Sequence, residues 1–310
     1  MSKNGLPRKP LTKRRLKNLI LNVLKNPFNM VVLVSLIILF CLIIIPLLTM
    51  IANTFTLAQG ELRRVQGHVG DFTLYYWKYI LASTMSGAVL WGPLKNSFIC
   101  GFFTVLVSVP LGSVLAWLMI RTDIPGKKIL GLLVTVPYMI PSWTKALAWL
   151  AMFRNSTSGA NGFLAGMGIP IPDWLAYGPI AIVLCMSMHY YAFSYIMVSG
   201  ALRSINSELE EMGEIQGASK AQILRHITLP LILPSVLSAT VMTISKSIGT
   251  YGVPANLGNR IGYYTLATKM RNFIDQGPQA VGYAMSIVLV LLAAVIIFSN
   301  QRIVGVRKSY

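Results

Sequence analysis

Long apolar runs, separated by shorter polar segments, dominate the sequence. A helix that crosses a bilayer needs about 20 consecutive residues that are mainly apolar, and six segments have this length and character. They cover residues 29–52, 94–120, 129–153, 178–202, 229–249 and 280–303. The pattern predicts an all-α membrane protein with six transmembrane helices.

The first predicted span differs from the others in what precedes it. Residues 31–45 form an almost unbroken aliphatic run, and residues 1–28 before it hold eight lysines and arginines. A cleaved signal peptide is the alternative interpretation, but the run is long and no A-x-A cleavage site follows it. We expect a retained N-terminal anchor helix.

Composition supports membrane insertion. Apolar residues make up 55% of the chain and charged residues 12%, whereas a soluble domain has about 25% charged residues. The net charge of +18 would suit nucleic acid, but the basic residues lie at the ends of apolar runs and are not interleaved with aromatic residues. The lipid bilayer is therefore the expected partner, and we expect no binding to nucleic acid.

Lysine and arginine are unequally divided between the two sides of the membrane. With the N-terminus in the cytoplasm, that side receives seventeen of them and the other side seven. Cytoplasmic segments are enriched in these residues, so both termini are expected inside a multi-pass protein. The expected division is a basic cytoplasmic tail at 1–28, a helix at 29–52, an extracytoplasmic loop at 53–93, a transmembrane core at 94–303 with a cytoplasmic loop at 203–230, and a cytoplasmic tail at 304–310.

No arrangement of catalytic or metal-binding residues emerges from the sequence. Cys41, Cys100 and Cys185 lie in separate apolar runs without metal-ligand spacing, as small packing residues do. Gly126 and Lys127 lack the upstream glycine and the following Ser or Thr of a phosphate-binding loop. An intramembrane enzyme, the alternative class, would need paired intramembrane acids or a metal motif. We expect no catalytic residue, metal or cofactor in this chain.

The loop at 203–230 concentrates the acids of the chain. Four of the nine carboxylates lie within seven positions, at Glu208, Glu210, Glu211 and Glu214. Ser207 followed three residues later by Glu210 matches a capping box, and acids in a first turn favour the positive end of the helix dipole. The pattern predicts a short amphipathic helix that begins here.

Glycines and prolines punctuate the rest of this loop. Gly213 and Gly217 allow a turn or a close backbone approach, and residues 218–227 carry apolar positions at helical spacing. Pro230 and Pro234 stand near the first turn of the next span, where proline is tolerated. We expect two short helices outside the membrane on the cytoplasmic side.

The spacing within this loop resembles a known signature. Glu211, Gly217, Ile227, Leu229 and Pro230 stand at the fixed positions of the E-A-A, three residues, G, nine residues, I-x-L-P pattern, with Met212 and Gly213 in place of the two alanines. This is the cytoplasmic EAA loop of the membrane subunits of binding-protein-dependent ABC importers, found in the bacterial inner membrane.

The resemblance implies a five-helix type I core, roughly over residues 90–303, with the first span as an added helix. It implies a coupling helix that docks on a cytosolic ATPase dimer, which binds ATP and Mg, together with a second permease subunit and an extracytoplasmic binding protein. By this analogy Glu211 meets a basic residue of the ATPase and Gly217 permits the bend. The coupling residues implied are Glu210, Glu211, Gly213, Gly217, Ala218, Ile227, Leu229 and Pro230.

Three further segments resemble one branch of this family. They are VPYMIPSWTKALAW at 136–149, GTYGVPANLG at 249–258 and YTLATKM at 264–270. The branch handles ferric iron, polyamines, phosphonates or thiamine, and ferric iron is the first expectation by this likeness. The glycines and prolines of these segments have two interpretations. They mark simple turns in outer loops, or they allow irregular backbone that lines a translocation cavity. The outer segments at 53–93 and 155–177 are either contacts for a binding protein or plain connections.

Ionisable residues inside the apolar spans are candidates for the translocation pathway. Such a group costs about 2.5 to 3.5 kcal/mol to insert and normally faces a cavity or a partner. Lys145 and His189 lie well inside their spans, whereas Lys246 is close enough to a span end to reach the headgroups. The charge of the two lysines favours an anionic substrate, such as a ferric complex or a phosphonate, over a polyamine. The pathway candidates are Lys145, His189, Lys246, Gly249 and Tyr251.

Overall fold

The computed structural model describes residues 27–62, 65–155, 159, 161–206 and 208–307. Within these residues nearly all secondary structure is helical, and the β contact found there is an isolated bridge between Thr56 and Phe72. The chain divides into two compact units, residues 1–53 and 54–310. Most of the predicted N-terminal tail lies outside the described residues.

The first unit contains α2, Pro27–Asn53. Its 27 residues span about 40 Å at the rise of an α-helix, which exceeds a hydrocarbon core of about 30 Å. Its bounds confirm the predicted first span to within two residues.

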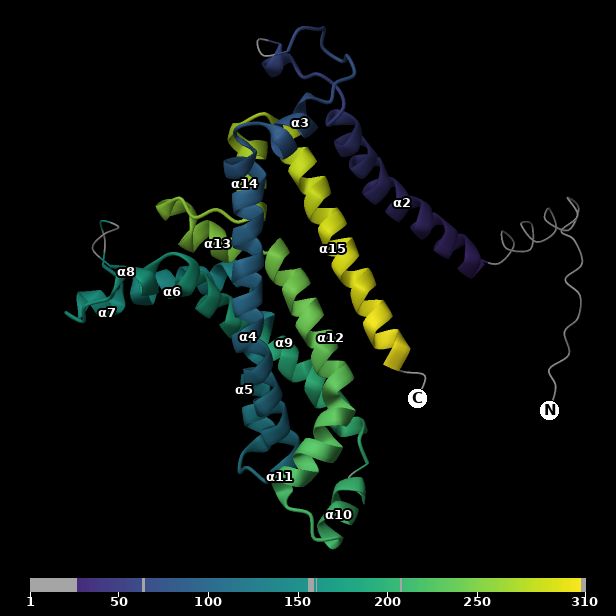
Figure 1. The fold of residues 1–310 in the computed structure, drawn as a ribbon, viewed down its shortest axis with the longest axis vertical. Coiled ribbons are helices and arrows are strands. Elements are labelled where there is room, and N and C mark those ends of the chain that lie inside the picture. Colours follow the sequence, from purple (N-terminus) through teal and green to yellow (C-terminus); the bar gives the residue numbers. More distant parts are fainter. Residues whose placement is uncertain (1–26, 63–64, 156–158, 160, 207, 308–310) are drawn as a thin grey trace, which may run out of the picture. The chain divides into compact units, whose positions relative to one another are not determined.

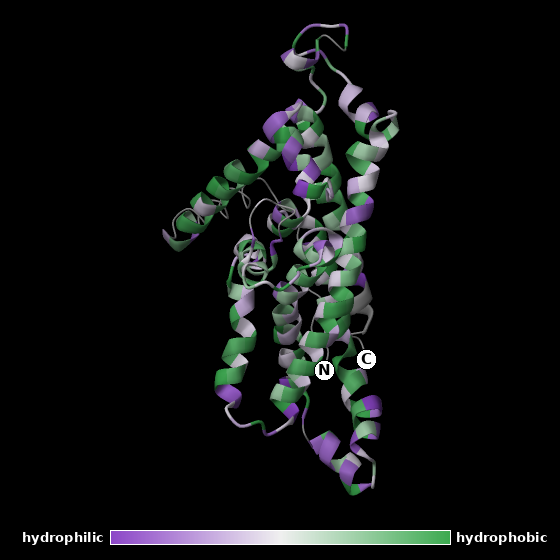
Figure 2. Cartoon of the chain, turned by 90° about the vertical axis from the view of Figure 1, so that its left-hand side faces the viewer, coloured by the Kyte–Doolittle hydropathy of each residue, from purple (hydrophilic) through white to green (hydrophobic). Residues whose placement is uncertain are grey.

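The second unit contains four long helices: α4 Gly92–Arg121, α9 Pro179–Ser204, α12 Leu229–Gly249 and α15 Gln279–Arg307 (Figure 1). α4 packs against α9 and α12, and α12 also packs against α15. With α2, these make five helices in the described residues that are long and apolar enough to cross a membrane. Figure 2 shows that the long helices are mainly hydrophobic along their length, with hydrophilic residues mostly near their ends.

A glycine sets the distance between α4 and α9. A Cβ added to Gly112 would lie 2.3 Å from the carbonyl oxygen of Tyr191 and 2.7 Å from the Cβ of Ser194. Small residues let membrane helices approach closely, where packing and not water drives association. Below this contact Ala116, Val198 and Leu202 are fully buried, so α4 and α9 form the centre of the unit.

The third predicted span is not one helix. It consists of α5, Lys127–Met139, and α6, Ser142–Phe153, separated at Ile140 and Pro141. Proline has no N–H and disfavours helical backbone at the preceding residue, and Ile140 is extended with φ −76° and ψ 131°. α6 accordingly runs in a different direction from α5 (Figure 1). The prediction of one continuous helix over 129–153 was wrong.

The predicted outer loop at 53–93 carries more structure than a plain connection. Its helix α3, Tyr75–Ala82, buries Tyr76 and Ile80 against α14, Leu266–Gln276, and α15. A π-helical turn at Gly87–Trp91 leads directly into α4, so the transmembrane core begins before residue 94. At its other end α15 continues to Arg307, beyond the predicted boundary at 303.

Shorter helices complete the second unit. They are α7 Phe163–Gly166, α8 Asp173–Ala176, α10 Glu208–Ile215, α11 Lys220–Ile223 and α13 Gly252–Leu257. α13 packs on α6, where a Cβ on Gly252 would lie 2.7 Å from the Cβ of Trp143. Two of the segments that resemble one branch of the family, 136–149 and 249–258, are therefore in direct contact.

The two short helices expected in the loop at 203–230 are only partly confirmed. α10 is a separate helix, but α11 continues through a π-helical turn, Leu224–Thr228, into α12. In that turn the N–H of Leu229 bonds to the carbonyl of Leu224. The wider π-helical spacing accommodates Pro230, which has no N–H to donate, so the proline does not separate the helices.

Candidate functional site

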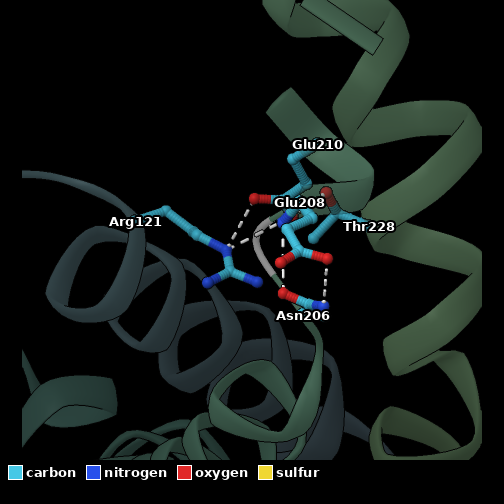
Figure 3. A network of polar contacts seen from close by, with 5 residues as sticks. All are labelled: Arg121, Asn206, Glu208, Glu210 and Thr228. Carbon is cyan, nitrogen blue, oxygen red and sulfur yellow. Dashed lines mark hydrogen bonds and ion pairs between the residues drawn. The ribbon is translucent and has the colours of Figure 1, made fainter. Parts of the chain in front are cut away.

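The start of α10 is held by an asparagine. The Asn206 Oδ1 accepts the N–H of Glu208 at 3.2 Å, and its Nδ2 donates to the Glu208 carboxylate at 2.8 Å (Figure 3). Asparagine satisfies free N–H groups at a helix start in this way. Ser207, the predicted capping residue, lies outside the described residues.

Glu210 connects α10 to two long helices. The Nε of Arg121, at the end of α4, lies 2.9 Å from Oε2 of Glu210, and the hydroxyl of Thr228 donates to Oε1 at 2.6 Å. The two charged side chains are only 16% and 17% exposed. Figure 3 shows Arg121 and Thr228 approaching the carboxylate from opposite sides. Glu210 therefore holds α10 against the end of α4 and the start of α12.

The remaining acids of α10 face outward. Glu208, Glu211 and Glu214 are exposed, and the carboxylate of Glu211 makes no ion pair with any described residue. Apolar Met212 and Ile215 are exposed beside them, at 57% and 85%. The outer surface of α10 therefore exposes acidic and apolar side chains together.

The turn after α10 depends on Gly217. Its φ is +83°, its N–H bonds to the carbonyl of Glu214, and the N–H of Ala218 bonds to that of Gly213. These two bonds form a Schellman motif, in which glycine is favoured because the left-handed conformation strains other residues. Gly217 therefore makes the bend that the sequence predicted.

Two packing details of this loop were not predicted. Ser219 and Gln222 form a capping box at the start of α11, although the S-x-x-Q spacing was visible in the sequence. A Cβ on Gly213 would lie 3.2 Å from both Ile223 and Ile227. A small residue at 213 thus lets α10 lie against the helix that continues into α12.

The two innermost pathway candidates lie together at the break between α5 and α6. The ammonium of Lys145 donates to the carbonyl of Pro137 and contacts Nδ1 of His189. That carbonyl is free because Pro141, four residues later, has no N–H to bond it. Lys145 is part-buried and lines a cavity of about 360 Å³ with Trp149, among others.

Aromatic rings extend this contact toward Lys246. Tyr138 stacks on His189 with ring centroids 5.3 Å apart and contacts Phe193 at 5.7 Å. The Lys246 ammonium lies 5.3 Å from the centre of the Phe193 ring, a cation–π distance. We call Lys145, His189, Tyr138, Phe193 and Lys246 the lysine–histidine cluster; it joins α5, α6, α9 and α12, and its two aromatic members were not predicted.

Gly249 and Tyr251 lie elsewhere. They line a cavity of about 400 Å³ that also includes Arg271 and Asp275, which form an ion pair at 2.8 Å. The structure thus separates the five pathway candidates into two groups. Among the described residues, no group of three or more His, Cys, Asp or Glu is placed to hold a metal ion.

Known proteins resemble this chain over most of its length. Residues 108–308 match the family described as the binding-protein-dependent transport system inner membrane component. The protein named as the sulfate transport system permease cysT of Marchantia polymorpha is 27% identical over 180 residues, which cover 57% of this chain and 59% of that protein. CysT of Salmonella typhimurium is 25% identical over 222 residues, covering 68% and 78%. PhnV of the same organism, named for 2-aminoethylphosphonate transport, is 28% identical over 232 residues, covering 75% and 80%.

Solved structures show the same fold. A bacterial ABC transporter involved in the import of the acidic polysaccharide alginate matches with a TM-score of 0.68 and 19% identity, over 94% of this chain and 100% of that one. The methionine ABC transporter MetNI in an inward-facing conformation matches with a TM-score of 0.55 and 23% identity, over 72% and 98%. Both likenesses confirm the expected ABC permease fold. Because the family match also covers well over half of the chain, this protein belongs to the inner-membrane permease components of binding-protein-dependent ABC importers.

Proposed function

We propose that this chain forms one half of the translocation pathway for a small oxyanion of the sulfate or phosphonate class. The observation that carries the proposal is the lysine–histidine cluster, in which Lys145 contacts His189 and Lys246 lies over the ring of Phe193, with Tyr138 packed against both rings. No described carboxylate forms an ion pair with either lysine. A fixed positive charge in a low-dielectric region favours an anion and repels a polyamine.

The relatives support this choice among the substrates. Their names concern sulfate and 2-aminoethylphosphonate, and phosphonate was among the sequence expectations. Ferric iron, the first expectation, finds no support in these names. We therefore place an oxyanion ahead of ferric iron.

The exposed surface of α10 is the proposed site of coupling. Glu211, with Met212 and Ile215 beside it, would meet a cytosolic ATPase that binds ATP and Mg, so that this chain remains non-catalytic. A second permease subunit supplies the other half of the pathway, and an extracytoplasmic binding protein delivers the solute. This arrangement requires both termini in the cytoplasm, as the distribution of lysine and arginine predicts.

Uptake by the reconstituted complex tests the proposed substrate. Proteoliposomes that contain the permease subunits, the ATPase and the binding protein are supplied with labelled sulfate, 2-aminoethylphosphonate, ferric citrate or putrescine. We expect ATP-dependent uptake of one of the two oxyanions. Uptake of ferric iron or putrescine alone would overturn the substrate assignment.

Variants of Lys145 test the cluster itself. Lys145→Gln retains a donor for the Pro137 carbonyl but removes the charge, and Lys145→Glu reverses it. Both are expected to reduce oxyanion uptake while basal ATPase activity is retained. Lys269→Gln is the matched control, because that lysine lies over the ring of Tyr264 in an outer segment. Unchanged uptake in both Lys145 variants would remove this lysine from the pathway.

A further inference from the structure

A second cationic cavity lies between α4, α5 and α9, on the side of the molecule that carries α10. Its volume is about 780 Å³. Lys127 and Lys128 enter it from the first turn of α5, and Arg203 enters it from the last turn of α9. None of the three forms an ion pair with a described residue. Three cationic side chains around one cavity, none of them paired with a described acid, favour an anionic ligand.

The N-terminus of α5 adds to this positive potential. α5 has 13 residues, and no side chain caps its start at Gly126. The free N–H groups and the dipole of such a terminus attract oxyanions. The N-terminus of α5 and the three cationic side chains therefore attract an anion to the same cavity.

A buried hydroxyl also lines this cavity without a partner. Ser199 is 5% exposed, lines the cavity, and its Oγ has no hydrogen-bond partner among the described residues. A buried polar group without a partner costs free energy. The hydroxyl would gain its missing bond from an oxygen of a bound anion.

We propose that this cavity binds a phosphate-type oxyanion, through Lys127, Lys128, Arg203 and Ser199. Apolar Met119, Ile120 and Ile196 also line it, which fits the headgroup and glycerol region of an anionic phospholipid. Basic pockets between helices at the cytoplasmic surface recognise such headgroups. Free phosphate presents the same oxygens without the apolar part, and the cavity shares no lining residue with the lysine–histidine cluster.

Two measurements on the full chain distinguish these sources. In the first, the protein is reconstituted in nanodiscs that contain phosphatidylglycerol and phosphatidylcholine, and the lipids that remain bound after release are identified by native mass spectrometry. In the second, inorganic phosphate is titrated into protein in nanodiscs of phosphatidylcholine alone, followed by calorimetry. Retained phosphatidylglycerol supports a lipid headgroup, and phosphate binding supports a free anion.

Variants connect either result to the cavity. The double variant Lys127→Gln and Lys128→Gln is expected to weaken binding by about fivefold for each cation removed, and Ser199→Ala tests the hydroxyl with almost no change in volume. Arg225→Gln is the matched control, because Arg225 is an exposed cation of the same side that lies outside the cavity. The proposal is overturned if neither ligand binds, or if Arg225→Gln reduces binding as much as the double variant does.

Discussion

The ion pair between Arg121 and Glu210 is expected to stabilise the coupling loop, and Glu210→Gln isolates its charge. The glutamine keeps an oxygen for the Thr228 hydroxyl, which donates at 2.6 Å, but it leaves Arg121 without its counterion. Unit charges about 4 Å apart interact with about 4 kcal/mol at an effective dielectric constant of about 20. Since both side chains are about one-sixth exposed, we expect a net loss of about 2 to 3 kcal/mol after desolvation and screening.

Thermal unfolding of the purified protein in one fixed detergent measures this loss. Glu211→Gln is the matched control, since it removes the neighbouring charge from an exposed position on the same helix. Surface substitutions of this kind change stability by about 0.5 kcal/mol or less. Arg121→Gln and the double variant complete a thermodynamic cycle, in which the coupling energy reports the pair alone.

Two results would refute this reasoning. Equal loss of stability in Glu210→Gln and Glu211→Gln would mean that the ion pair contributes nothing beyond an exposed charge. A double variant whose loss equals the sum of the single losses would mean that Arg121 and Glu210 do not interact in the folded protein.

Three further predictions concern the loop and the helix core. Glu211→Lys should lose most stimulation of the ATPase in proteoliposomes, since reversal of an interfacial charge costs about 2 to 5 kcal/mol; normal stimulation with intact assembly would exclude Glu211 from the contact. Gly217→Ala should lower the thermal unfolding temperature, because left-handed backbone costs a non-glycine residue about 1 to 2 kcal/mol; an unchanged temperature would contradict the strained turn. Gly112→Ala should reduce the yield of folded protein in size-exclusion chromatography, whereas Gly101→Ala on the same helix should not, because its Cβ would lie 3.5 Å from the nearest atom; equal yields would contradict the close helix contact.

Features set by a short stretch of chain were predictable from the sequence. The apolar length of a span determines membrane insertion without reference to other helices, and α2, α9 and α12 begin and end within two residues of the prediction. The bend at Gly217 was predictable for the same reason, because its left-handed φ is a property of that residue and its turn. The family signature in this loop likewise depends on local spacing.

The broken third span shows the limit of hydrophobic pattern. Residues 129–153 are apolar enough to cross the membrane, and prolines inside membrane helices are often accommodated. Hydrophobicity therefore could not reveal that the helix ends before Pro141. The orientation of α6 depends on its packing against α13, which is about 100 residues away in the sequence.

The roles of individual charged side chains were decided only by the tertiary structure. Four neighbouring glutamates look equivalent in the sequence, but Glu210 alone among them faces Arg121, which lies 89 positions earlier. Lys145 likewise meets His189 across 44 positions because the break at Pro141 frees a carbonyl beside them. A local pattern indicates that a charge needs a partner, whereas the packing of distant helices determines whether that partner lies within the chain or outside it.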